Sequence, residues 1–302
     1  MADKYGRSAL WDTYHRTRIT RDASRDLSGF KSTDVNYKLG LWDPRTNGVR
    51  YLKALIYNLA GRLDETGWAR LRRISNRDTG RPIAVRTNDE VVCMDYLQAV
   101  LELGFMAPHV TLDGARVLEI GAGYGRTCHA ILANHDVAAY YIVDLENSLE
   151  LARAYLGEVL DRDFAKVRFV RAEDLDRVLD DVRFDLCLNI DSFAEMDPDT
   201  VADYLGFIAD HCGRLYVKNP VGKYLDRSLD DHAGGAELVT MALRTGLLRD
   251  VIDIHDSEAV RAQSAKFVDA YRPAPDWTLV ADGWAEPWSY YWQALYRADV
   301  NP

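Results

Sequence analysis

The sequence predicts an α/β protein with a mostly parallel sheet, preceded by a smaller helical segment. From residue 88 onward, short β-rich runs alternate with helical stretches, which is the pattern of right-handed β-α-β units. The charge balance also changes near residues 85–90, since residues 1–90 carry 18 basic and 11 acidic residues whereas residues 91–302 carry 19 and 36. We therefore expect residues 1–87 to form a mainly helical N-terminal cap and residues 88–302 to form the sheet domain.

Length and composition exclude several classes of protein. The 302 residues are 48% hydrophobic and 28% charged, as in ordinary globular proteins, so a disordered or fibrous chain is not expected. No apolar run reaches the ~20 residues that span a bilayer, and the charged start lacks the apolar segment of a signal peptide. Four widely separated cysteines give neither a zinc motif nor a disulfide framework. We expect a cytoplasmic protein with no membrane partner, and its net charge of −10 opposes nucleic-acid binding.

The N-terminal segment has helical spacing of apolar residues in two stretches, 52–63 and 68–74. All the cofactor signals described below lie after residue 117, so we expect this segment to lie on the substrate side. Next, Thr87 and Glu90 have the spacing of a capping box, and apolar residues follow at helical intervals. This pattern predicts a helix that continues to Gly104, where glycine provides a stop.

Five β-rich runs follow, each separated from the next by a helical stretch, at 115–120, 140–143, 167–170, 185–190 and 214–217. The helix before the fifth run is bounded by Asp197 as its cap, Pro198 at its first position and Gly213 past its end. After residue 220 the sequence predicts helices over 236–247 and 257–271 and strand-like runs over 277–281 and 290–297.

The first of these runs leads into a glycine-rich turn, with Gly121, Gly123 and Gly125 before a helix. Glycines permit a tight turn and a close approach of ligand to backbone, and the helix N-terminus offers unpaired N–H groups. A dinucleotide site places its third glycine at the position that Arg126 occupies here. Glu119, two residues before the first glycine, would repel a pyrophosphate. A cationic ligand is favoured, and S-adenosylmethionine fits because its ammonium and sulfonium are positive.

Acidic residues follow the next two strands. Asp144 ends the second run, where a carboxylate can accept both ribose hydroxyls, although that spacing also suits NAD. Glu173 and Asp174 follow the third run, near the expected adenine edge. The residues predicted to bind the cofactor are Glu119, Gly121, Ala122, Gly123, Gly125, Arg126, Asp144, Leu145, Glu173, Asp174 and Asn189.

With Val117-Leu-Glu-Ile-Gly-Ala-Gly-Tyr-Gly125 as first motif, the chain resembles the class I S-adenosylmethionine-dependent methyltransferases over residues 88–298. It also resembles the narrower sugar O-methyltransferase family, through Tyr141–Leu145 with Ala154–Leu156, Asn189-Ile-Asp-Ser-Phe-Ala-Glu-Met196 and Leu215–Asn219. It departs from that family after Leu145, where Glu146-Asn147 replaces a Pro-Glu pair. The resemblance implies a Rossmann-like, doubly wound, seven-stranded sheet whose last strand is antiparallel.

Methyl transfer to a hydroxyl requires a base near the carboxyl end of the fourth strand, since ligands lie outside these strand ends. Asp191 and Glu195 both follow that strand, and proximity to the cofactor favours Asp191. His232, in a polar glycine-rich loop, is the third candidate base. The structural alternative for Glu195 is a capping or pairing role. No metal site is predicted, although Asp230 and Asp231 together with Asp191 leave one open.

Ser192, Asn219 and Trp288 are the candidate substrate-binding residues, with the aromatic stretch 284–292 able to stack on a sugar. Packing is the alternative for these aromatic rings. The function expected is methylation of a hydroxyl on a sugar or glycosylated small molecule, such as a natural product or a nucleotide-linked sugar. The alternatives are a small-molecule N-methyltransferase, a phenol O-methyltransferase and a catalytically silent cofactor-binding domain. Self-association of the chain stays open.

Overall fold

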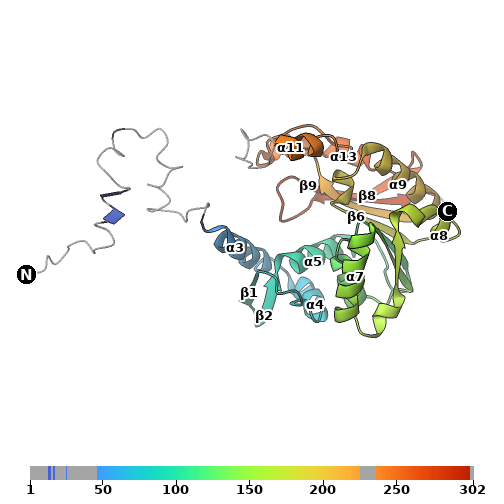
Figure 1. Ribbon diagram of the computed structural model, residues 1–302, viewed down its shortest axis with the longest axis horizontal. Coiled ribbons are helices and arrows are strands. Elements are labelled where there is room, and N and C mark those ends of the chain that lie inside the picture. The colour runs from blue at the N-terminus through green and yellow to red at the C-terminus, as the bar shows by residue number, and fades with distance from the viewer. Residues whose placement is uncertain (1–12, 15, 18–24, 26–45, 225–235, 300–302) are drawn as a thin grey trace, which may run out of the picture. The chain divides into compact units, whose positions relative to one another are not determined.

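The computed structural model describes residues 13–14, 16–17, 25, 46–224 and 236–299 (Figure 1). The chain divides into two compact units, Met1–Asn58 and Leu59–Pro302. Most of helix α3 (Gly48–Ala60) belongs to the first unit, and its last two residues belong to the second. Residues 59–87 are therefore part of the same unit as the sheet. This unit begins earlier than the predicted boundary at 87/88.

The second unit is built on a seven-stranded sheet with the order β5-β4-β3-β6-β7-β9-β8. β3, β4, β5, β6 and β7 pair in parallel, and β9 is antiparallel to both of its neighbours, β7 and β8. The strands are β3 (Arg116–Ile120), β4 (Ala139–Asp144), β5 (Val167–Arg171), β6 (Leu186–Ile190), β7 (Arg214–Pro220), β8 (Trp277–Trp284) and β9 (Tyr291–Ala298). The predicted doubly wound sheet with one antiparallel strand is confirmed, and all seven predicted runs are strands.

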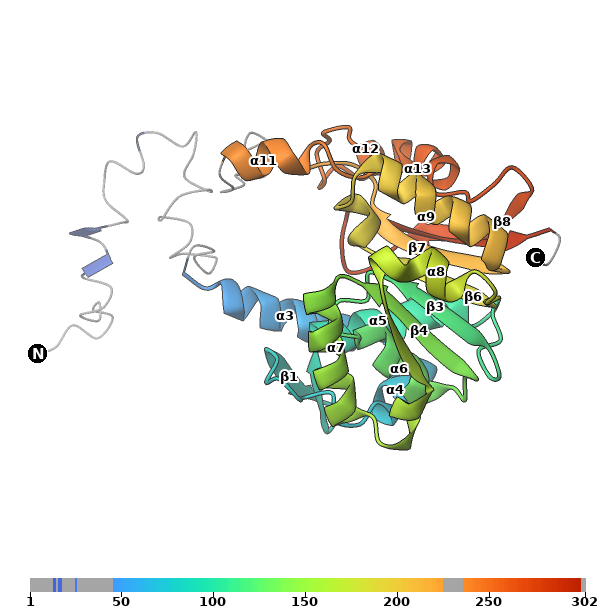
Figure 2. The same cartoon turned by 45° about the vertical axis from the view of Figure 1, so that its right-hand side comes forward.

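Helices cover both faces of this sheet, as Figure 2 shows. α4, α5, α6 and α7 lie on one face, and α8, α9, α12 and α13 lie on the other. Their bounds are α4 (Glu65–Arg73), α5 (Met94–Met106), α6 (Arg126–Asn134), α7 (Glu146–Val159), α8 (Leu175–Leu179), α9 (Pro198–His211), α11 (Ala236–Ala242), α12 (Ser257–Ala262) and α13 (Ser264–Ala270). Short 3-10 turns occur at Arg162–Lys166, Ala172–Asp174 and Ser192–Ala194.

Strand β7 illustrates how alternation assigns side chains to the two faces. Leu215 and Val217 belong to the apolar core that α8, α9 and α13 complete. Tyr216 and Lys218 point to the other face, where the Tyr216 ring lies 5.9 Å from that of Phe105 on α5. A lysine thus occupies a fully buried position on the face that α5 covers.

The helix predicted from the Thr87 capping box to Gly104 differs from the structure at both ends, since α5 starts later and runs past Gly104 to Met106. Ala84–Thr87 (β1) and Glu90–Cys93 (β2) form an antiparallel hairpin, and α5 begins only at Met94. Thr87 pairs with Glu90 across a two-residue turn in which Asn88 and Asp89 both have positive φ, 49° and 63°. Asparagine and aspartate tolerate this left-handed backbone, which is the geometry of a type I′ hairpin turn.

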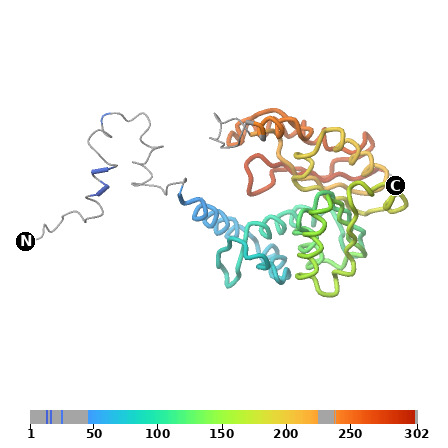
Figure 3. Tube along the Cα trace, viewed as in Figure 1, coloured from blue at the N-terminus to red at the C-terminus, as the bar shows by residue number. Residues whose placement is uncertain are grey.

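The C-terminal part of the unit also agrees with the prediction, with shorter helices. The predicted helix over 236–247 ends at Ala242, and the one over 257–271 is divided at Gln263 into α12 and α13. Figure 3 shows the C-terminal chain, in red, returning beside the segment of β7. All four cysteines are buried free thiols.

Candidate functional site

The glycine-rich turn after β3 has a left-handed backbone at each of its three glycines, with φ of 73° at Gly121, 57° at Gly123 and 92° at Gly125. Their surroundings differ. A Cβ on Gly121 would lie 2.1 Å from Ser192 Oγ, and one on Gly125 would lie 2.8 Å from Leu156 Cδ1. A Cβ on Gly123 would meet nothing within 4 Å. Packing therefore requires Gly121 and Gly125, whereas Gly123 faces open space that a ligand can enter.

Asp144, at the end of β4, holds this turn from the neighbouring strand. One carboxylate oxygen accepts the Gly123 N–H at 2.9 Å, and the other accepts the Leu145 N–H at 2.7 Å. Each oxygen keeps a second lone pair for a ligand. The following side chain, Leu145, is 70% exposed, which leaves an apolar surface beside the carboxylate.

A cavity of about 360 Å³ opens beside the glycine turn. It lies at the carboxyl ends of β3, β6 and β7 and reaches the segment before β9, which is where ligands bind in sheets of this kind. The residues that line it are Gln98, Glu119, Gly121, Ala122, Gly123, Tyr124, Arg126, Thr127, Ile190, Asp191, Lys218, Trp288, Tyr290 and Tyr291.

Glu119 lines this cavity although only 2% of it is exposed. Its carboxylate accepts a hydrogen bond from the Tyr140 hydroxyl at 2.8 Å. Burial raises the pKa of Glu119 to about 7, because the ionised form loses its water, and the hydrogen bond from Tyr140 opposes this shift only in part. A cation placed in the cavity would favour the ionised form.

Asp191 follows β6 and has φ of 70°, a conformation that residues other than glycine rarely adopt. Its side chain lines the cavity and accepts a hydrogen bond from the Tyr291 hydroxyl, and its N–H donates to the Lys218 carbonyl at 2.8 Å. Burial and the charge of Asp191 raise the pKa of Tyr291, so the phenol keeps its proton. The structure therefore holds a carboxylate of fixed orientation at the aromatic side of the cavity.

Three charged side chains meet at the cavity: Arg126 and Lys218 line it, and Glu102 lies behind them. The Glu102 carboxylate, from α5, lies 2.8 Å from Lys218 Nζ and 3.0 Å from an Arg126 guanidinium nitrogen. Burial alone would raise the pKa of Glu102, but Arg126 and Lys218 together bring it below its ordinary value. Burial lowers the pKa of Lys218, and Glu102 opposes that shift. Gln98 joins the group, since its Oε1 accepts from Lys218 Nζ at 3.2 Å and from Trp288 Nε1 at 3.1 Å.

Several predicted site residues lie beneath the cavity rather than on it. The Asn189 amide donates to the Ile120 carbonyl at 3.1 Å and to Ser192 Oγ at 2.7 Å, and its carbonyl accepts from the Asn219 amide at 2.9 Å. Both asparagines are 0% exposed. Asn189, Ser192 and Asn219 are absent from the cavity lining, so they fix the ends of β3, β6 and β7 relative to one another instead of offering groups to a ligand.

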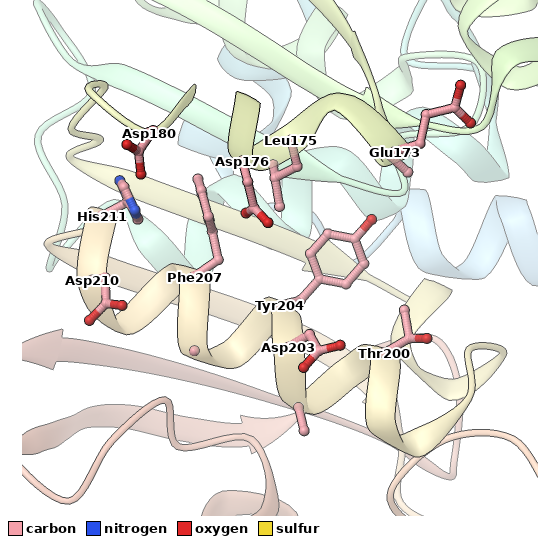
Figure 4. Close-up of a pocket in the computed structure, with 13 residues that line it drawn as sticks. Glu173, Leu175, Asp176, Asp180, Thr200, Asp203, Tyr204, Phe207, Asp210 and His211 are labelled. Atoms are coloured by element: carbon pink, nitrogen blue, oxygen red, sulfur yellow. The ribbon is translucent and has the colours of Figure 1, made fainter. Parts of the chain in front are cut away.

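Glu173 and Asp174 belong to the 3-10 turn that directly follows β5. Arg171 pairs with Glu173 at 3.2 Å and with Asp174 at 2.9 Å, and Arg177 also pairs with Asp174. Neither lines the cavity beside the glycine turn. Glu173 instead borders a wider, acidic hollow of about 790 Å³ between α8 and α9, where Figure 4 shows its carboxylate pointing away from Asp180 and His211.

The other two candidate bases differ from Asp191 in their placement. Glu195 does not line the cavity; burial and then the Asp191 charge raise its pKa, and Lys223 opposes this. The Lys223 ammonium donates to the Ala194 carbonyl at 2.9 Å and to Thr245 Oγ1 at 3.2 Å, which anchors the loop after β6. His232, with Asp230 and Asp231, lies outside the described residues. Within residues 46–224 and 236–299, no group of three or more His, Cys, Asp or Glu side chains is arranged for a metal ion.

The cavity also contains residues that the sequence analysis did not select. They are Gln98, Tyr124, Thr127, Ile190 and Lys218, whereas Tyr290 and Tyr291 belong to the predicted aromatic stretch 284–292. One signal for Lys218 was visible, because a lysine directly follows the apolar run Leu215–Val217 of a predicted buried strand. No local pattern indicated that Glu102, 116 residues earlier, would be its partner.

No protein-family model and no curated protein matches the sequence. Solved structures resemble the fold at low identity. The pyocyanin biosynthetic protein PhzM is 17% identical with a TM-score of 0.45, over 95% of this chain and 76% of that one. PigF with SAH is 15% identical with a TM-score of 0.44, over 88% and 78% of the chains, and the methyltransferase domain of bacterial CtHen1-C is 11% identical with a TM-score of 0.46, over 67% and 97%. In the part of the chain that the structure describes, no helix is long and apolar enough to cross a membrane.

Proposed function

We propose that the chain binds S-adenosylmethionine and transfers its methyl group to a hydroxyl of a sugar or a glycosylated small molecule. One observation carries this proposal. The cavity beside the glycine turn is bounded by two acidic side chains, Glu119 and Asp191, and by the aromatic rings of Trp288, Tyr290 and Tyr291. A cationic methyl donor suits the acidic residues, and a sugar ring suits the aromatic walls.

The residues present fit this cofactor. The space above Gly123 admits a ligand, and the Asp144 carboxylate beside it has lone pairs for the two ribose hydroxyls. The exposed Leu145 offers an apolar surface for the adenine ring. Glu119 would pair with the ammonium group. When bound, S-adenosylmethionine supplies a methyl group activated by a sulfonium.

Asp191 is the proposed base. Tyr291 donates to one of its oxygens and so orients the carboxylate, which leaves the other oxygen for the proton of the acceptor hydroxyl. Asn189, Ser192 and Asn219 hold the strand ends that position Asp191. Trp288 and Tyr290 would stack on the acceptor ring and so place its hydroxyl in line with the methyl group.

Cofactor binding is tested by calorimetry with S-adenosylhomocysteine. Gly123→Val and Asp144→Ala should each weaken binding at least about 10-fold, or about 1.4 kcal/mol. Gly114→Val is the matched control, because Gly114 also has a positive φ, 78°, and also has nothing within 4 Å of its Cβ position, but precedes β3 at the opposite end. Equal affinity in all three folded variants would remove the cofactor assignment.

The acceptor class is tested with methyl-labelled S-adenosylmethionine and a panel of free sugars, nucleotide sugars, glycosides, phenols, amines and an RNA oligonucleotide. Mass spectrometry should find the label on a sugar hydroxyl. Label on a phenol or an amine would replace the acceptor proposal, and cofactor binding without transfer to any panel member would favour a silent binding domain.

A further inference from the structure

Lys218 lies on the acceptor side of the cavity. Along the sheet, Asp144 ends β4, the glycine turn follows β3 and Asp191 follows β6. Lys218 is on β7, where it pairs with Ile190, one strand further from the glycine turn and next to β9. The proposed cofactor position spans the ends of β4, β3 and β6. A side chain from β7 would therefore face the acceptor, on the far side of the methyl group from the rest of the cofactor.

The ammonium of Lys218 has two protein partners, and it has three protons to donate. They are Glu102 Oε1 at 2.8 Å and Gln98 Oε1 at 3.2 Å, both on α5. Only 1% of Lys218 is exposed, yet it lines the cavity. The third N–H is therefore available to an atom that enters the cavity.

The charges around Lys218 are shared among several groups. Glu102 is already paired with Arg126 at 3.0 Å, so that pair alone is neutral. Lys218 adds a second cation to the same carboxylate, and the charge of Asp191 on the cavity wall also acts on it. A buried ammonium costs free energy even when it is paired. An apolar side chain of similar length would fill this strand position without that cost. Lys218 therefore places a cation at the cavity wall, where it can stabilise negative charge that develops on a substrate oxygen.

We propose that Lys218 is a catalytic residue that binds the acceptor hydroxyl oxygen and stabilises the negative charge that develops on it, with Gln98 and Glu102 as positioning residues. This inference rests on the proposed function. The hydroxyl proton passes to Asp191 as the oxygen forms its bond to the methyl carbon, and the electron pair of the broken carbon–sulfur bond stays on sulfur. Lys218 keeps its three protons throughout and acts as a fixed donor at the oxygen.

The test compares Lys218→Met with Tyr216→Phe, on the panel member that the native protein methylates fastest. Tyr216 lies on the same face of β7 two residues earlier, and its hydroxyl bonds to Gln293 outside the cavity, so its variant should keep near-native kcat. Lys218→Met should lower kcat about 10²- to 10³-fold, the usual effect of losing one oxyanion donor. Its affinity for S-adenosylhomocysteine should stay within about 3-fold of native. If Lys218→Met does not fold, the smaller Lys218→Leu takes its place, and it likewise leaves the neutral Arg126–Glu102 pair intact.

A second readout separates this role from a structural one. A deoxyfluoro analogue of the same acceptor, with fluorine on the carbon next to the methylated hydroxyl, lowers the pKa of that hydroxyl. Its alkoxide needs less stabilisation, so the Lys218 variant should lose less kcat on the fluoro analogue than on the parent acceptor.

Three results would overturn the inference. Equal losses on both acceptors would make Lys218 structural, and weakened S-adenosylhomocysteine binding with unchanged kcat would assign it to the cofactor carboxylate. Native kcat in the variant would give it no role in the reaction. In all three cases the proposed function stands, because the native protein still binds cofactor and transfers the methyl group. If the native protein binds no S-adenosylhomocysteine, or methylates no panel member, both proposals fall together.

Discussion

At the scale of single residues, Asp191 combines backbone strain with a carboxylate on the cavity wall. A φ of 70° destabilises an aspartate by about 1 kcal/mol, whereas glycine adopts this φ without strain. Asp191→Gly would relieve this strain but would also leave the hydroxyl of the half-buried Tyr291 without its acceptor, so the midpoint of thermal unfolding should not rise. Asp191→Asn keeps an acceptor for Tyr291 and should lower kcat about 10²- to 10⁴-fold at saturating acceptor with S-adenosylhomocysteine affinity unchanged. Near-native kcat in Asp191→Asn would move the search for the base to Glu195 or His232.

The raised pKa of Glu119 predicts that cofactor binding depends on pH. Its pKa of about 7 lies above the value of an ordinary glutamate, so its neutral form stabilises the fold fully below about pH 4.5, and that contribution is lost as the pH rises through 7. A bound ammonium favours the ionised form, so binding at pH 6 should release close to one proton and affinity should rise toward pH 7. Calorimetry of S-adenosylhomocysteine binding in two buffers of different ionisation enthalpy measures the proton. Glu119→Gln should abolish the release; an unchanged release would assign the proton to another group.

At the scale of elements, the β1–β2 hairpin turn contains two residues in the left-handed region, and glycine is preferred at the second position of such turns. Asp89→Gly should stabilise the protein by about 0.5–1 kcal/mol, seen as a higher thermal midpoint, whereas Asp89→Val should destabilise it because a β-branched side chain strains a φ of 63°. Neither substitution should alter cofactor affinity. Destabilisation by glycine would mean that the aspartate side chain supports the turn.

The same hairpin shows where sequence patterns are ambiguous. Thr87 and Glu90 match a capping box, and Val91 and Met94 begin a helical spacing, yet cross-strand pairing decides the structure of residues 84–93. The helix register is correct from Met94 onward, because a long amphipathic stretch carries more information than one turn. The strands were predictable because buried parallel strands are short apolar runs between helices, such as Leu215–Val217.

The site was less predictable than the fold for a related reason. Glu119 and Asp144 lie at the carboxyl ends of β3 and β4, and Gly123 lies in the turn after β3, so chain order was enough to place them at one edge of the sheet. The bonds of Lys218 to Glu102 and of Tyr291 to Asp191 join residues about a hundred positions apart, which no local spacing encodes.

At the scale of the whole molecule, the division after Asn58 supplies the boundary at which to test the proposal that the N-terminal segment serves the acceptor. Trp68 and Leu71 of α4 are buried within the second unit, and β1 pairs with β2, so a chain that begins near Asp89 would lose part of its own core. Residues 59–302 should fold and bind S-adenosylhomocysteine with native affinity while turnover is lost. Residues 89–302 should unfold at a lower temperature. Full turnover by residues 59–302 would show that the first 58 residues are not needed for the reaction.

The order of strands in the sheet has a consequence for biosynthesis. β9 follows β8 in the chain but lies between β7 and β8, and in the sheet that the structure describes β8 has β9 as its one neighbour. While the ribosome is still producing residues 277–290, β7 has an unpaired edge and β8 has no place in the sheet, so the nascent chain exposes strand edges that can aggregate. Emergence of β9 closes both gaps in one step and delivers Tyr291 to Asp191. We therefore expect the nascent chain to need chaperone protection until β9 emerges, and its cavity to be incomplete until then. Rare codons before residue 291 would lengthen the time for which these strand edges are exposed.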